Sequence, residues 1–229
     1  MNVCDLRSAA CAVAVLLTCL LSAPLVGAQT PPTLFPLEEG RSWTYHMSVE
    51  VGGQRKAIVY TTTVVRTEEL DGVGACAVLE SRSDKRLMQV EWYRAEEGKV
   101  LNPQRQDGPR AAPKAFKERV FLDLSAVQKL DDDPEARPSW AWADVAGQAT
   151  GTLTLAGKER VKIGTLGFFE CYVLVDEGTY TVGTAVRVQE RRLWLAPDLG
   201  IVKEVMTVKN TSGEVTIKTE SELQRYAKP

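Results

Sequence analysis

Hydrophobic and polar side chains alternate along most of this chain, and the alternation begins at Ser42. Every second residue from Trp43 to Val51 is apolar or aromatic, whereas the residues between them are polar or charged. A period of two is typical of a β-strand that buries one face and exposes the other. Gly52-Gly53 follows, and because both glycines tolerate positive φ, this pair predicts a hairpin turn into a second strand.

Short strands separated by turn residues are expected as far as the C-terminus. They occupy segments rich in β-branched and aromatic residues, at 57–66, 76–80, 87–93, 150–155, 159–163, 168–176, 179–182, 185–194, 201–208 and 214–223. Turn signals such as Asp71-Gly72, Gly157, Gly178 and Asn210–Gly213 separate them. The pattern predicts a mainly β protein with a strongly curved antiparallel sheet, a half-barrel or barrel of about 10–12 strands.

The charged segment 103–133 interrupts the alternation. Phe116, Val120, Leu124 and Val127 follow one another at spacings of three or four residues. This spacing favours an amphipathic helix within 114–130, and an irregular loop is the alternative. Either would cover one side of the sheet.

Three short motifs recur in the same order in the two halves of the chain. S-W-x-aromatic, C-x-V-L and W-x5-G-x-V lie at 42–45, 76–79 and 92–100, and again at 139–142, 171–174 and 194–202. They predict an internal duplication, with chance similarity between strands as the alternative. The single β-domain 42–229 would then contain repeat A at 36–102, a connecting or lid segment at 103–133, repeat B at 134–204 and C-terminal strands at 205–226.

The first 28 residues have the pattern of a signal peptide. Arg7 precedes an apolar run from Ala9 to Leu21, and small residues before Ala28 suit cleavage after that residue. A lipid anchor at Cys19 is the alternative. We therefore expect an exported protein, periplasmic or extracellular, with no transmembrane segment after processing. The Pro-rich segment 29–41 should lie over its surface.

Composition narrows the functional classes. The chain has 28 basic and 30 acidic residues and is 44% hydrophobic, so it gives no general electrostatic attraction for nucleic acid and is too apolar for a disordered chain. Only Cys76 and Cys171 remain after removal of the leader. Two cysteines in an exported protein predict a disulfide, and two buried thiols are the alternative.

Few residues suit catalysis, and we expect no catalytic residue, no metal site and no cofactor. His46 is the single histidine, and it lies on the polar side of an alternating strand. The paired carboxylates fall in expected turns or linkers, such as Glu68-Glu69 and Asp131–Asp133. A carboxylate-dependent hydrolase would need two acids that converge in a cleft.

Aromatic residues near strand ends are the remaining candidates for ligand binding. They are Trp43, Tyr45, Trp92, Trp140, Trp142 and Trp194. Large rings with one polar atom suit a partly apolar ligand, although the same rings are common in a filled core.

Three longer motifs carry a family resemblance. P-L-x-x-G-x-x-W-x-Y at 36–45, G-x-x-G-x-F-x-C-Y-V at 164–173 and W-L-A-P-D-L-G-I-V at 194–202 resemble those of uncharacterised secreted bacterial β-proteins. Such proteins are similar in architecture to lipoprotein-carrier and periplasmic lipid-binding half-barrels. The resemblance implies a curved sheet covered by residues 103–133 and an apolar or amphiphilic ligand such as lipid. It favours a non-enzymatic binding domain, with a cell-envelope structural or interaction module that has a filled core as the alternative.

Overall fold

The computed structural model describes residues 33–229, so the expected signal peptide and its cleavage at Ala28 lie outside the described residues. The described part contains thirteen strands and one α-helix. The elements are β1 (Ser42–Val51), β2 (Gln54–Leu70), β3 (Gly74–Ser83), β4 (Arg86–Glu96), β5 (Lys99–Gln106), β6 (Lys114–Lys117), β7 (Val120–Asp123), α2 (Leu124–Asp132), β8 (Ser139–Asp144), β9 (Ala149–Ile163), β10 (Gly167–Val182), β11 (Ala185–Ala196), β12 (Gly200–Lys209) and β13 (Val215–Ala227).

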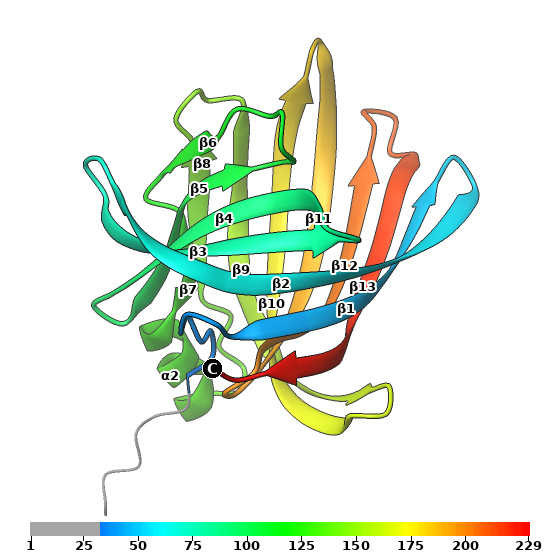
Figure 1. Ribbon diagram of the computed structural model, residues 1–229. Helices are drawn as coiled ribbons and strands as arrows, with labels where there is room; N and C mark the ends of the chain where they lie inside the picture. The colour runs from blue at the N-terminus through cyan, green and yellow to red at the C-terminus, as the bar shows by residue number, and fades with distance from the viewer. Residues whose placement is uncertain (1–32) are drawn as a thin grey trace, which may run out of the picture. The chain divides into compact units, whose positions relative to one another are not determined.

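The strands form a closed antiparallel barrel. Their order is β4-β3-β2-β1-β13-β12-β11-β10-β9-β8-β6-β5, and β4 pairs with β5 to close a ring of twelve, while β7 adds to β5 as an extra strand. In Figure 1, β2, β3 and β4 cross the front of this unit, whereas β9 to β12 run upward behind them. The predicted mainly β, strongly curved antiparallel sheet is confirmed, in its closed form.

Two expected turns are wrong, because β9 and β10 each continue through a glycine. Gly157 follows a bulge at which β9 shifts register against β10, and Gly178 pairs with Gly151 in the middle of the sheet. A Cβ on Gly178 would lie 2.9 Å from the ring of Trp142. A glycine inside a strand thus marks a bulge or a close approach here rather than a turn.

Residues 103–133 build part of the barrel wall instead of lying across an open sheet. They supply the end of β5, then β6 and β7, so the expected helix over 114–130 is wrong for its first ten residues. The helix begins at Leu124, where the Asp123 side chain accepts a hydrogen bond from the Ser125 backbone N–H. It buries Val127 and Leu130 and lies at the lower end of the barrel in Figure 1.

The described part of the Pro-rich segment 29–41 lies only partly on the surface, because Thr33 and 38–40 are exposed whereas 34–36 are buried. Leu34 and Phe35 are buried. The Phe35 ring lies 4.8 Å from the Tyr93 ring and 4.9 Å from the Phe121 ring, measured between centroids. Apolar burial against these rings fixes a segment that its prolines alone would leave at the surface.

The repeated motifs occupy matching strands. The first copies lie on β1, β3 and β4, and the second copies lie on β8, β10 and β11. Val78 is the cross-strand partner of Trp92 in β3–β4, and Val173 is the partner of Trp194 in β10–β11. These are the pairings that the predicted duplication requires.

A β-bulge also recurs at matching positions. Val65 is the extra residue of β2 beside the pair Val64–Leu79, and Ala156 is the extra residue of β9 beside the pair Leu155–Leu174. Bulges interrupt the ladder at one defined residue, so a shared bulge is a more specific similarity than shared strand composition. The duplication itself remains a prediction.

Candidate ligand-binding cavity

The barrel interior contains a cavity of about 250 Å³ that is partly open to solvent. It is lined from β1 to β5 on one side and from β11 to β13 on the other. One end is apolar and aromatic, and its buried lining residues are Phe35, Trp43, Tyr45, Leu79 and Tyr93. This end therefore offers a dry surface for an apolar group.

Every methionine of residues 33–229 lines this cavity. Met47, Met88 and Met206 come from β1, β4 and β12, which are widely separated in sequence. The unbranched thioether side chain adapts to irregular shapes and contacts apolar or aromatic groups well. Three such side chains around one cavity suit a flexible apolar ligand.

The remaining lining includes two arginines and two glutamates. Glu91 and Arg105 are cross-strand partners on β4 and β5. Arg191 of β11 donates from Nε and Nη2 to the two carboxylate oxygens of Glu204 on β12, at 2.8 and 3.1 Å. Burial opposes the charge of Arg191, but the Glu204 carboxylate outweighs it and raises the pKa of that guanidinium.

Three tyrosines in the lining are kept neutral. Burial is the main cause that raises the pKa of Tyr45, Tyr60 and Tyr93 above the ordinary value. The Tyr45 hydroxyl donates to the Ile201 carbonyl at 2.9 Å, and its ring stacks on that of Tyr60 at 5.1 Å between centroids. These phenols act as apolar surface and hydrogen-bond donors rather than as bases.

Two of the six aromatic residues predicted from the sequence line the cavity, namely Trp43 and Tyr45. Trp43 Nε1 donates to the Leu199 carbonyl at 2.6 Å, which fixes the indole at the apolar end. Met47 continues the same alternation on β1 and is half-buried. Its place in this pattern is the sequence signal that could have added it to the predicted site.

The other four tryptophans lie away from the cavity. Trp140 Nε1 donates to the Val120 carbonyl, Trp142 Nε1 to Asp176, and Trp194 Nε1 to Glu159. Trp92 packs in a small separate cluster with Cys76, Val78 and Val90. The structure therefore gives these rings packing roles and does not bring all six together.

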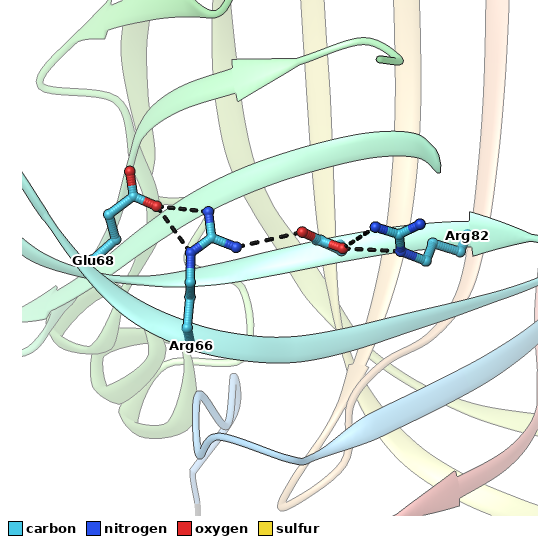
Figure 2. A network of polar contacts seen from close by, with 4 residues as sticks. Arg66, Glu68 and Arg82 are labelled. Atoms are coloured by element: carbon cyan, nitrogen blue, oxygen red, sulfur yellow. Dashed lines mark hydrogen bonds and ion pairs between the residues drawn. The ribbon is translucent and has the colours of Figure 1, made fainter. Parts of the chain in front are cut away.

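The cluster around Trp92 lies on the outer face of the barrel. Val78 and Glu80 alternate with Leu79, which lines the cavity, so they point to the opposite side of β3. Figure 2 shows the charged residues of this face, where Arg66 contacts both Glu68 and Glu80, at 2.7 and 3.4 Å. Arg82 contacts Glu80 at 2.7 Å in the same network.

The predicted disulfide is absent from the structure, in which Cys76 and Cys171 are buried free thiols. Their strands β3 and β10 are not neighbours in the barrel, and the two side chains belong to different apolar clusters. A disulfide requires Cα atoms within about 7 Å, which equivalent strands of two halves do not provide here. Both cysteines pack as small hydrophobic residues.

We expect two titratable thiols in unreduced protein that has lost the leader. Burial raises the pKa of Cys171 to about 12 and also raises that of Cys76. The thiolate is the reactive form, so alkylation of these buried thiols should be slow in the folded state. Thiol counting should give none at short times in buffer and two in guanidinium chloride. A count of zero in guanidinium chloride would instead indicate that the two cysteines form a disulfide.

Residues 33–229 contain no cluster of three His, Cys, Asp or Glu side chains suited to a metal ion. The single histidine, His46, is exposed on β1. In the same range no helix has the length and apolar character needed to cross a membrane. The acids of the cavity, Glu91 and Glu204, are not the turn pairs that the sequence singled out.

Comparison with known proteins supports the fold. No protein-family model matches the chain, and no curated protein matches it. A solved protein from Bacteroides fragilis, described as exported with a YmcC-like fold, is 16% identical and has a TM-score of 0.53 over 86% of this chain and 100% of its own. The hypothetical lipoprotein YmcC from Escherichia coli is 14% identical, covers 93% of this chain and 97% of its own, and has a TM-score of 0.36. The resemblance to secreted bacterial β-proteins is thus confirmed at the level of fold.

Proposed function

We propose that this chain is an exported, non-enzymatic β-domain that binds a small amphiphilic molecule, such as a lipid, inside its barrel. The observation that carries the proposal is the composition of the cavity wall. Aromatic rings line one end, and the three methionines lie beside the two arginines and two glutamates farther along the barrel. An amphiphile has one part for each environment.

The size of the cavity limits the ligand. Its volume of about 250 Å³ is slightly below the range of about 300–1,000 Å³ that is common for small-molecule sites. The occupant is therefore a short amphiphile or one chain of a larger lipid. The N-terminal leader supports export, and the Bacteroides fragilis protein of similar fold is itself described as exported.

Native mass spectrometry tests the proposal directly. Protein purified from its own host without detergent should carry an additional mass that disappears after extraction with organic solvent. Titration of the extracted protein with a fluorescent amphiphile should then show saturable binding. An unchanged mass together with no saturable binding would contradict the proposal.

We expect Met206→Trp to weaken binding of the fluorescent amphiphile at least about tenfold. The larger ring would occupy part of the cavity that Met206 lines, so the ligand would lose room and apolar contact. Val188→Trp is the matched control, because Val188 on β11 is 41% exposed and lies outside the lining. Equal affinities of the two variants would place the ligand elsewhere.

A further inference from the structure

The polar part of the cavity has hydrogen-bonding capacity that its own side chains leave unused. Arg191 uses Nε and Nη2 on Glu204, and Arg105 uses Nε on Asp107 at 2.7 Å. Among residues 33–229, neither Nη of Arg105 makes a hydrogen bond, and Nη1 of Arg191 makes none. The Glu91 carboxylate likewise has no donor in this part of the chain.

These unused groups are open to the cavity. Four side-chain nitrogens of residues 33–229 are fully enclosed and make no hydrogen bond, and they belong to Arg41, Trp92, Arg119 and Arg192. The Nη nitrogens of Arg105 and the Nη1 of Arg191 are not among them, and both side chains line the cavity. A ligand group placed there would find donors from arginine and an acceptor from Glu91.

The fixed charges of the lining are balanced. Glu91 lies opposite Arg105 in the β4–β5 ladder, and Glu204 holds Arg191 through two hydrogen bonds. Glu91 also acts on Arg191, since its carboxylate is among the causes that raise the pKa of both arginines. Two positive and two negative groups therefore share one cavity that has no excess charge of either sign.

A charged head group would meet repulsion in this arrangement. An anion would approach Glu91 and Glu204, and a cation would approach Arg105 and Arg191. Like charges at short distance repel, and this repulsion opposes binding of a charged head group. To bind Arg191 fully, a carboxylate would have to displace Glu204 from a bidentate contact.

Building on the proposed function, we propose that the ligand is an amphiphile with an uncharged head group that both donates and accepts hydrogen bonds, such as the hydroxyls of a monoacylglycerol. Its oxygens accept from the free Nη groups of Arg105, and its O–H donates to the Glu91 carboxylate. Its acyl chain lies against the aromatic end of the cavity, which includes Trp43 and Tyr45.

Three ligands with the same short acyl or alkyl chain test the head group, namely monodecanoylglycerol, decanoate and decyltrimethylammonium. Each is titrated below its critical micelle concentration into the purified, solvent-extracted protein, by calorimetry or by displacement of the fluorescent amphiphile. Monodecanoylglycerol should bind at least about tenfold more tightly than either charged ligand.

The variant Glu91→Gln should change this selectivity. Removal of the carboxylate charge should raise the affinity for decanoate at least about tenfold and change that for monodecanoylglycerol less than about threefold. Glu50→Gln is the matched control, because Glu50 is an exposed carboxylate on β1 that alternates with the inward Met47. Arg105→Met, which removes the donors, should weaken monodecanoylglycerol binding about tenfold and provides the second variant if Glu91→Gln fails to fold.

The outcomes separate this inference from the proposed function. If neither these ligands nor the fluorescent amphiphile binds and the native mass is unchanged, the proposed function and this inference both fail. If the fluorescent amphiphile binds and none of the three ligands does, the head-group inference alone fails. If they bind with similar affinities, or if Glu91→Gln leaves decanoate binding unchanged while the protein remains folded, the head-group inference fails and the cavity remains an amphiphile site.

Discussion

Asp176→Ala should lower the free energy of unfolding by about 3–5 kcal/mol, because it leaves a buried guanidinium without its counter-charge. Asp176 on β10 and Arg119 are 1% and 6% exposed, and Arg119 Nη2 lies 3.0 Å from Asp176 Oδ2. The other oxygen of Asp176 accepts a hydrogen bond from Trp142 Nε1 at 2.8 Å. Burial, the largest effect on Arg119, lowers its pKa, so the pair is already under a desolvation penalty.

The location of this pair increases its expected effect. The guanidinium of Arg119 packs against two rings that contact each other, 4.7 Å from the centroid of Phe116 and 4.5 Å from that of Trp142. β6, which holds Phe116, pairs with β5 and with β8 through only two residue pairs on each side. The contacts of Arg119 with β8 and β10 thus reinforce the part of the barrel wall with the fewest ladder pairs.

Urea unfolding of matched variants measures this effect. Glu177→Ala changes the adjacent, exposed carboxylate and should shift stability by less than about 0.5 kcal/mol. The double variant Arg119→Met/Asp176→Leu should recover most of the loss, since it removes both charges together. A loss below about 1 kcal/mol for Asp176→Ala would show that water reaches Arg119 and that the pair does not hold the barrel wall.

The strands were predictable because their signal is local. The alternation from Trp43 to Val51, followed by the Gly52-Gly53 turn, predicts a hairpin from about a dozen consecutive residues. In the structure this hairpin is formed by β1 and β2. Closure of the barrel through β4 and β5 was not predictable from such patterns. Strands of four residues, such as β6, are too short to show a period of two. The apolar residues at 114–123 therefore show a helical spacing although they form strands.

The candidate site was only partly predictable for a related reason. Trp43 and Tyr45 share the inward face of β1, but Trp92 points to the opposite side of β4 from Tyr93, which lines the cavity. Which face of a strand is inward depends on closure, so residue type alone could not place Trp92. Glu91 was missed because a charged residue is normally assigned to solvent, although it lies two positions from Tyr93 and shares its face.

Gly151→Val should destabilise the protein by about 3 kcal/mol, although the propensity of valine for strands favours a change in the opposite direction. Gly151 lies within β9, where a Cβ would come within 2.5 Å of the Glu177 carbonyl oxygen and 2.7 Å of the Trp142 ring. The same ring covers Gly178 on β10, its cross-strand partner, so the indole rests on two adjacent glycines. A side chain at this position would displace Trp142 and with it the hydrogen bond to Asp176.

The matched control is Thr152→Val, which places the same side chain at the next, exposed position of β9 and should change stability by less than about 0.5 kcal/mol. Strand propensity favours glycine to valine more than threonine to valine, so it would make Gly151→Val the more stable of the two variants. A lower stability of Gly151→Val therefore reports the space occupied by the Trp142 ring and the Glu177 carbonyl. Unfolding in urea, with the fluorescence of the protein as the signal, measures that difference. Equal stabilities would mean that the ring can move away without loss, and that Trp142 and Arg119 do not act together to keep the barrel closed.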